Sequence, residues 1–313
     1  MVTELKDRNN PRRGTASHSQ YSLFEFMREF PDDAACLEWL WRKRFSEDGE
    51  HAHCPKCEEV RTFKRYATAQ QRQSWTCTHC GHHLHPTAGT IFHKSSTSLH
   101  SWFYGVYLMT STRCGISAKQ LERELGVGYK TAWRMFHLIR GLLAENVTDL
   151  SGTVEIDETY IGGVKRQMRG ETMSQLHKRR YDAKVRVQGM VERGGRVRAD
   201  VSMDGPLLPN VLMHVVPSAM IYTDETPAYK RLTVSGYAHR RVHHTSKVYV
   251  SGDVHTNTIE GFWSLVKRGI SGVYHSVSKK YLQMYFDEYI FRYNHRDDDV
   301  PMFDQVLGRA IPR

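Results

Sequence analysis

The sequence predicts an α/β fold, with a mixed sheet and flanking helices, preceded by a small metal-binding module. Two alternating apolar runs around Gly194-Gly195 predict a β-hairpin, and residues 153–163 and 219–223 have the pattern of further strands. Helical patterns separate and follow these strands. Two Cys-x2-Cys pairs lie upstream of all of them. A chain of 313 residues is long enough for more than one domain.

Composition and charge restrict the class of protein. With 40% hydrophobic and 25% charged residues the chain has a globular composition, and it holds no apolar run of about 18 residues that could span a membrane. Residues 1–20 lack the apolar centre of a secretion signal, and we expect a polar, mobile tail. The net charge of +10 favours a polyanionic partner, most simply nucleic acid; a merely basic protein is the alternative.

Residues 21–50 predict two short helices that break at Pro31. Asp32 or Asp33 is placed to cap the second helix, because a side-chain oxygen there can accept from free backbone N–H groups. Apolar residues at helical spacing predict a core-facing stripe on that helix: Leu37, Leu40 and Trp41.

Residues 51–95 contain four cysteines with the spacing of a zinc ribbon. Nineteen residues separate Cys54-x2-Cys57 from Cys77-x2-Cys80. Zn²⁺ takes four tetrahedral ligands, and each pair can supply two thiolates, so the pattern predicts one structural Zn²⁺. A redox Cys-x2-Cys motif, the alternative, needs no second pair. A module of about 35 residues is too small to be held by its own core, so the metal would supply the folding free energy.

Residues 98–145 predict a helix-turn-helix DNA-binding domain. Ser117 can cap one helix, residues 126–128 form a tight turn with two glycines, and a second helix begins at Tyr129. We expect Tyr129, Lys130 and Arg134 on the accessible side of this second helix, where they would contact DNA. A plain antiparallel helix pair is the alternative.

The remaining residues, 150–296, predict a second domain, followed by a C-terminal tail at 297–313. Its basic stretch at 163–184 has few apolar residues and predicts a mobile loop, with Lys165, Arg166 and Arg169 as candidate DNA contacts. After the hairpin we expect a helix at 209–215, a strand at 219–223, a helix at 227–232, a strand near 240–244, and helices at 255–269 and 278–294.

Three acidic residues in this domain come from separate elements. Asp157 lies in the first strand, Asp224 follows the end of a later strand, and Glu260 lies on a late helix. Such a set suits two hard divalent ions, which take oxygen ligands and act in phosphoryl transfer. Ordinary caps and surface acids are the alternative. Glu155 competes with Asp157 because strand alternation places both on one face, whereas Glu158 points to the opposite face.

Four stretches resemble a known family: VEIDETYIGG, IYTDETPAY, HTNTIEGFWSLVKRGISGVYH and, near the end, FRYNHR. They resemble the motifs of DDE-type insertion-sequence transposases, in the bacterial group with an N-terminal zinc ribbon and a ribonuclease-H-like catalytic core. The resemblance runs from Tyr21 to Arg296. It implies that this core is a ribonuclease-H-like mixed sheet with flanking helices.

The resemblance also implies the site residues. Asp157, Asp224 and Glu260 would bind two Mg²⁺ (or Mn²⁺) ions, and Lys267 would be the accompanying basic residue near the cut DNA. Some members of the group use Asn as the third residue, so Asn257 is the alternative to Glu260, although Glu260 is the better ligand on charge. Lys267 follows Glu260 by seven residues, close to two helical turns, so the two share a helix face.

The implied activity is hydrolysis of a phosphodiester at the ends of the element, followed by attack of the freed 3′-OH on target DNA. The implied partners are double-stranded DNA, as element ends and as target, and further copies of the chain in a dimer or larger synaptic complex. The implied location is the bacterial cytoplasm, at the nucleoid. A DNA-binding regulator that has lost catalysis and a host ribonuclease-H-like nuclease are the alternatives.

Overall fold

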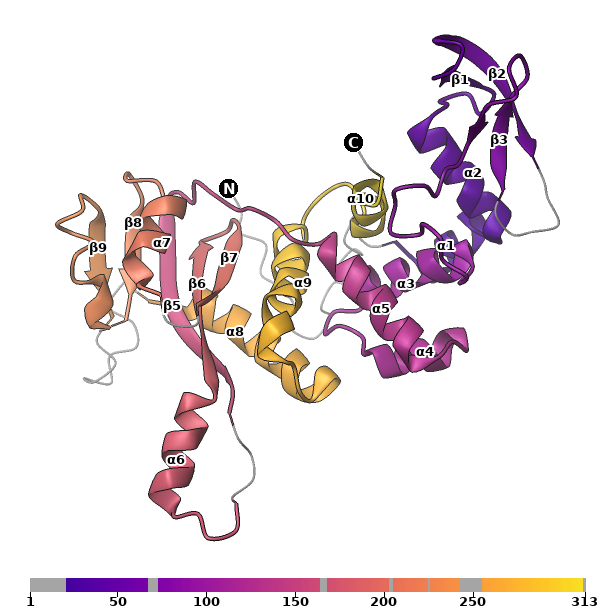
Figure 1. The fold of residues 1–313 in the computed structure, drawn as a ribbon. Coiled ribbons are helices and arrows are strands. Elements are labelled where there is room, and N and C mark those ends of the chain that lie inside the picture. Colours follow the sequence, from indigo (N-terminus) through magenta and orange to yellow (C-terminus); the bar gives the residue numbers. More distant parts are fainter. Residues whose placement is uncertain are drawn as a thin grey trace, which may run out of the picture.

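The chain folds into a mixed α/β structure, as the sequence predicts. The computed structural model describes residues 21–66, 73–163, 168–202, 205–224, 226–242 and 255–311. These residues contain ten α-helices and two sheets (Figure 1). Residues 1–20, expected as a tail, lie outside the described ranges. Within the described ranges no helix is both long and apolar enough to cross a membrane.

The first two helices begin and end where the capping residues predict. Helix α1 (Leu23–Glu29) starts at a capping box made by Ser22 and Glu25, and α2 (Asp33–Arg44) is capped by Asp32, whose carboxylate accepts from Ala35 N. Asp33 has a different role. Its Oδ1 accepts from His100 N at 2.8 Å and so ties the start of α2 to α3 (Leu99–Ser111).

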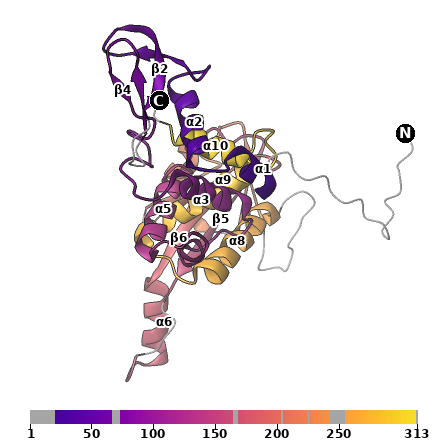
Figure 2. The ribbon, with the colours of Figure 1, turned by 90° about the vertical axis from the view of Figure 1, so that its right-hand side faces the viewer.

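The four cysteines lie in an antiparallel four-stranded sheet that packs on α2. The strands are β1 (His51–Cys54), β2 (Glu59–Tyr66), β3 (Ser74–Cys77) and β4 (His83–Leu84), in that order. Trp41 of α2 stacks on Trp75 of β3 with ring centroids 4.7 Å apart, and its Nε1 donates to Gly49 O at 2.7 Å. The small sheet thus shares its core with α2 and stands at one end of the molecule (Figure 2).

Residues 118–141 form the two helices and tight turn that the sequence predicts. Helix α4 (Ala118–Leu125) is capped by Ser117 and ends at Gly126, which has the left-handed φ of +62° that glycine adopts easily. Helix α5 (Tyr129–Gly141) follows after two further residues. The apolar sides of both helices enter the core formed with α3.

The C-terminal end contains a helix where we expected a tail. Helix α10 (Met302–Arg309) buries Phe303, Val306 and Leu307 in the core around α3. Tyr21, at the other end of the described chain, stacks on Phe303 with ring centroids 4.7 Å apart. Three apolar residues at helical spacing are a short signal next to a charged stretch, and only the tertiary packing makes this segment helical.

Replacing Phe303 by Ala should lower the free energy of unfolding by about 3 kcal/mol, because the ring is 1% exposed and the cavity cannot close fully. Urea unfolding followed by circular dichroism measures this change. Val300→Ala is the control, since Val300 is 53% exposed and should change stability little. Equal stability of the two variants would mean that α10 is not part of this core.

The second sheet has five strands in the order β7-β6-β5-β8-β9. Strands β5 (Thr153–Gly162), β6 (Lys184–Glu192) and β7 (Val197–Ser202) are antiparallel, whereas β8 (Met220–Thr223) and β9 (Ala238–Arg241) run parallel to β5. Helices α8 (Asn257–Gly269) and α9 (Leu282–Asn294) pack on one face, and α7 (Leu207–His214) packs on the other. The segment expected as a helix at 227–232 holds only a short 3-10 turn, Pro227–Tyr229.

A buried ionic cluster joins this sheet to the N-terminal helices. Glu288 of α9 is fully buried and accepts from Arg140 of α5 at 2.7 Å and from Arg292 at 2.6 Å. Tyr274 donates to the same carboxylate at 2.9 Å. Although burial raises the pKa of Glu288, the two guanidinium groups hold it below its usual range. Helix α9 therefore lies between the sheet and α5, in contact with both (Figure 1).

The basic stretch between β5 and β6 contains a helix, so the expectation of a mobile loop throughout is wrong. Helix α6 (Met173–Asp182) begins at a capping box made by Thr172 and Gln175 and buries Leu176. Arg179 pairs with Glu171 at 2.7 Å. These local interactions stabilise a helix that projects away from the sheet (Figures 1 and 2).

Candidate active site

The fold brings the three predicted carboxylates to one end of the five-stranded sheet. Strand β8 is parallel to β5 with Thr223 opposite Ile156, so the next residues, Asp224 and Asp157, lie at the same level. Helix α8 packs on the same side of β5 as Asp157 and carries Glu260 in its first turn. The three acids are far apart in the sequence, but the fold places all of them near the same end of the sheet.

The charges of the three acids interact. Burial, together with the nearby carboxylates of Asp224 and Glu260, raises the pKa of Asp157 to about 6, although hydrogen bonds lower it in part. Among the described residues, the only set of three or more metal-ligand atoms within 4.8 Å of one another is formed by cysteines, so the three carboxylates are more widely spread.

A tryptophan from α8 orients Asp157. Trp263, 4% exposed, donates from Nε1 to Asp157 Oδ2 at 3.0 Å. Gly189 of β6 pairs directly with Asp157, and a Cβ at this position would lie 2.4 Å from the Trp263 ring. The absent side chain at 189 therefore makes room for the ring, a contact between distant residues that no local pattern predicts.

Replacing Gly189 by Ala should lower the free energy of unfolding by about 1–3 kcal/mol, because the added methyl forces the Trp263 ring out of its position. Chemical unfolding followed by tryptophan fluorescence measures the loss. Gly141→Ala is the matched control, since a Cβ there meets no atom within 4 Å. A Gly189→Ala protein as stable as the control would contradict the packing described here.

Glu155, the competitor of Asp157, is fully buried and engaged elsewhere. Its Oε1 accepts from Arg193 Nε at 2.7 Å and Thr258 Oγ1 at 2.9 Å, while Oε2 accepts from the backbone N–H groups of Thr258 and Ile259 at 2.8 and 3.0 Å. Both carboxylate oxygens are thus occupied by donors. Glu155 shares a face with Asp157 as expected, and its hydrogen bonds join β5 to the start of α8.

Glu158 is a fourth acid near the site. As strand alternation predicts, it points to the face opposite Asp157, where the hydroxyl of Tyr229 donates to it. Burial and the charges of Asp224 and Asp157 together raise its pKa to about 8, while Arg186 lowers it in part. Its surroundings therefore favour the protonated carboxyl group; strand alternation had predicted only the face on which it lies.

The other expected residues of α8 lie on its surface. Asn257, the first residue of the helix, is exposed, and Glu260 is exposed and accepts from Thr256 Oγ1 at 3.0 Å. Lys267 is exposed in the last turn of the same helix. An exposed ammonium group there is accessible to a phosphate, and it also suits the negative end of the helix dipole.

The four cysteines form a compact cluster that fits a zinc ion. Their Sγ atoms all lie within 4.8 Å of one another, with 3.5 Å between Cys54 and Cys80 and 4.0 Å between Cys57 and Cys77. Four sulfurs at about 2.3 Å from Zn²⁺ in a tetrahedron would be about 3.8 Å apart. Burial raises the pKa of Cys77, but hydrogen bonds, chiefly from backbone N–H groups, bring it down to about 7 and favour the thiolate.

The candidate DNA contacts that the structure describes are accessible. Tyr129 is 45% exposed at the start of α5, and Lys130 and Arg134 are exposed on the same helix. Arg169 is exposed just before α6. Lys165 and Arg166 fall outside the described residues.

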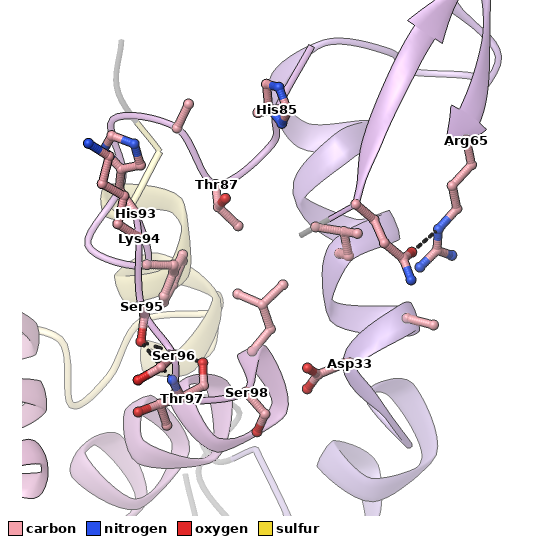
Figure 3. Close-up of a pocket in the computed structure, with 16 residues that line it drawn as sticks. Asp33, Arg65, His85, Thr87, His93, Lys94, Ser95, Ser96, Thr97 and Ser98 are labelled. Atoms are coloured by element: carbon pink, nitrogen blue, oxygen red, sulfur yellow. Dashed lines mark hydrogen bonds between the residues drawn. The ribbon is translucent and has the colours of Figure 1, made fainter. Parts of the chain in front are cut away.

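A pocket of about 680 Å³ lies far from the carboxylates, between α2, the cysteine-bearing sheet and the segment before α3 (Figures 1 and 3). Its polar lining is partly engaged: Arg65 donates to Gln73 Oε1, and Asp33 accepts from the start of α3. Hydroxyl groups of residues 95–98 line the opposite wall. The pocket offers no set of acids and is not a candidate for the same chemistry.

Comparison with known proteins gives consistent results. Residues 149–294 match the family described as ISXO2-like transposase domain. The chain is 30% identical over 263 residues to an uncharacterized protein in transposable element ISH50 of Halobacterium salinarum, covering 77% of this chain and 84% of that protein. It is 29% identical over 91 residues to an uncharacterized transposase-like protein of Haemophilus influenzae, covering 29% of this chain and 72% of that protein.

Among solved structures, the chain matches one from the cryoEM structure of the simian T-cell lymphotropic virus intasome in complex with PP2A regulatory subunit B56 gamma. The match has 14% identity and a TM-score of 0.24, and it covers 55% of this chain and 64% of that chain. At this TM-score the match carries no argument about the fold.

Proposed function

We propose, from the premise that this chain belongs to the family of insertion-sequence transposases, that it cuts DNA at the ends of its element and joins the freed 3′-OH to target DNA. One observation carries the proposal: adjacent strands β5 and β8 and the first turn of α8 bring Asp157, Asp224 and Glu260 to one end of the sheet, near enough for the other two charges to raise the pKa of Asp157. Like charges near one another in a half-buried site are costly unless cations or protons balance them.

The sheet supports a ribonuclease-H-like core for residues 150–296. Three antiparallel strands are followed by two strands parallel to β5, and helices pack on both faces. The two aspartates lie on or directly after the adjacent strands β5 and β8. Rigid neighbouring strands hold catalytic groups more reproducibly than loops do.

The carboxylates of Asp157, Asp224 and Glu260 would hold two Mg²⁺ (or Mn²⁺) ions. Such ions would make bound water and the 3′-OH more acidic and would balance charge on the phosphate. Trp263 keeps Asp157 turned toward the site, and the two hydrogen bonds from Thr226 keep Asp224 in place. Glu260 is the better third residue than Asn257, because its charge already raises the pKa of Asp157.

Basic and aromatic groups along the chain would bind the DNA. We assign recognition of the element end to the N-terminal helices (21–50), a zinc ribbon (51–95) holding one Zn²⁺, and a helix-turn-helix domain (98–145). Tyr129, Lys130 and Arg134 would meet DNA from α5, and Arg169 from the segment just before α6. Lys267, on the same helix as Glu260, would contact a phosphate near the cut. Joining two ends requires at least two copies of the chain in one complex.

A gel assay distinguishes this function from its two rivals. The full chain is incubated with Mg²⁺, a labelled duplex carrying the element end, and a supercoiled plasmid. A transposase yields cut ends and end–plasmid joints, a nuclease yields cuts without joints, and a regulator shifts the duplex without cutting it. Either of the last two outcomes would overturn the proposal.

A further inference from the structure

We propose that Glu155 is a positioning residue that sets the place of Glu260 relative to Asp157 by holding the start of α8 against β5. The inference rests on the proposed function, because it assigns Glu155 a task in that carboxylate site. It also gives a role to a buried acid that the reaction itself does not use.

The carboxylate of Glu155 acts as the cap of a helix distant in sequence. The first N–H groups of a helix have no partner within the helix, and Thr256, the residue before α8, gives none of them a side-chain hydrogen bond. Glu155 Oε2 accepts from two of them, Thr258 N and Ile259 N. Its negative charge also suits the positive end of the helix dipole.

Arg193 completes this link between β5 and α8. It donates from Nε to Glu155 and from Nη2 to His255 O at 2.9 Å, and its guanidinium lies over the Tyr222 ring of β8. His255 Nδ1 accepts from the same Nη2 at 3.0 Å. The buried charge is thus paired, and the same contacts connect α8 with both strands that lead to Asp157 and Asp224.

The contacts of Glu155 determine where Glu260 lies relative to Asp157. Glu155 and Asp157 are two residues apart on one face of β5, and Glu260 directly follows Ile259, whose N–H Glu155 accepts. Asp157 and Glu260 are therefore connected through Glu155 and its buried hydrogen bond with Ile259 N. Loosening it lets the first turn of α8 rotate or move away, while Asp157 itself stays in place.

Glu155→Gln in the full chain tests this inference, because Gln keeps the shape and one acceptor but loses the charge. Binding of Mn²⁺, followed by the electron paramagnetic resonance signal of the free ion, should weaken about tenfold, the usual scale for groups that orient metal ligands. Hydrogen exchange of the N–H groups in 256–260 should accelerate. Affinity for DNA should not change. Glu192→Gln is the matched control, since the Glu192 carboxylate, at the end of β6, accepts only from Ser151 among the described residues.

Unchanged Mn²⁺ affinity and exchange in Glu155→Gln, with wild-type Mn²⁺ binding intact, would overturn the inference and leave the proposed function standing. A wild-type chain that binds no Mn²⁺ would overturn the metal site itself, and the inference with it. If Glu155→Gln does not fold, Thr258→Val decides, because it removes only the hydroxyl that donates to Glu155 Oε1. It should weaken Mn²⁺ binding by about threefold, a smaller step in the same direction; no change would overturn the inference.

Discussion

Replacing Asp224 by Asn is expected to reduce cutting and joining of element-end DNA by at least about a thousandfold, the scale seen when a central catalytic group is removed. A neutral amide is a poor ligand for a hard divalent ion. The fold should survive, because an Asn at 224 can still accept from Thr226 N and pair with its hydroxyl, as Asp224 does. A loss of activity in Asp224→Asn would therefore come from the lost carboxylate ligand and not from unfolding.

The measurement compares rates of cutting with affinity for the same duplex. Asp149→Asn is the matched control, because Asp149 is exposed, away from the sheet end, and has the positive φ that Asn also tolerates. Cutting by Asp224→Asn at close to the control rate would remove Asp224 from the site. A loss of DNA affinity equal to the loss of rate would assign it to binding instead.

Replacing Cys77 by Ser should release the zinc ion and unfold the ribbon. Structural Zn²⁺ contributes about 10 kcal/mol or more to small domains of this kind. Trp75, which stacks on Trp41 of α2, should then become exposed, so its fluorescence should shift to longer wavelength. Binding to element-end DNA should weaken strongly, since one of its proposed binding modules is lost.

Zinc content per chain and tryptophan fluorescence test this expectation together. Cys114→Ser is the control, because Cys114 is exposed and outside the cluster. One zinc per wild-type and Cys114→Ser chain, and none in Cys77→Ser, is the expected result. A wild-type chain that folds normally without zinc would contradict the assignment.

The elements that the sequence predicted well are those with strong local signals. Asp32, Ser117 and Gly126 mark helix ends by capping chemistry that acts within a few residues. Helices α6 and α10 lack a clear apolar pattern. Helix α6 has a capping box at Thr172 but buries only Leu176, and α10 is helical because Phe303 packs into a core formed by distant helices.

The sequence suggested which residues belong to the candidate site, but it did not show how their side chains contact one another. Positions on strands and helix made Asp157, Asp224 and Glu260 candidates, the resemblance to a family chose them over neighbouring acids, and the fold brings them to one end of the sheet. Alternation also placed Glu155 beside Asp157, but it could not show that its oxygens accept from a helix about 100 residues later. Contacts of that range depend on the tertiary fold.

The most direct test of the central claim is to sequence the DNA products that the full chain makes with Mg²⁺, an element-end duplex and a target plasmid. The account predicts plasmids in which the 3′ ends of the element are joined to target strands at staggered positions, and none when Asp224→Asn replaces the wild type. Products that are cut but never joined, or joints that form equally well with Asp224→Asn, would contradict it.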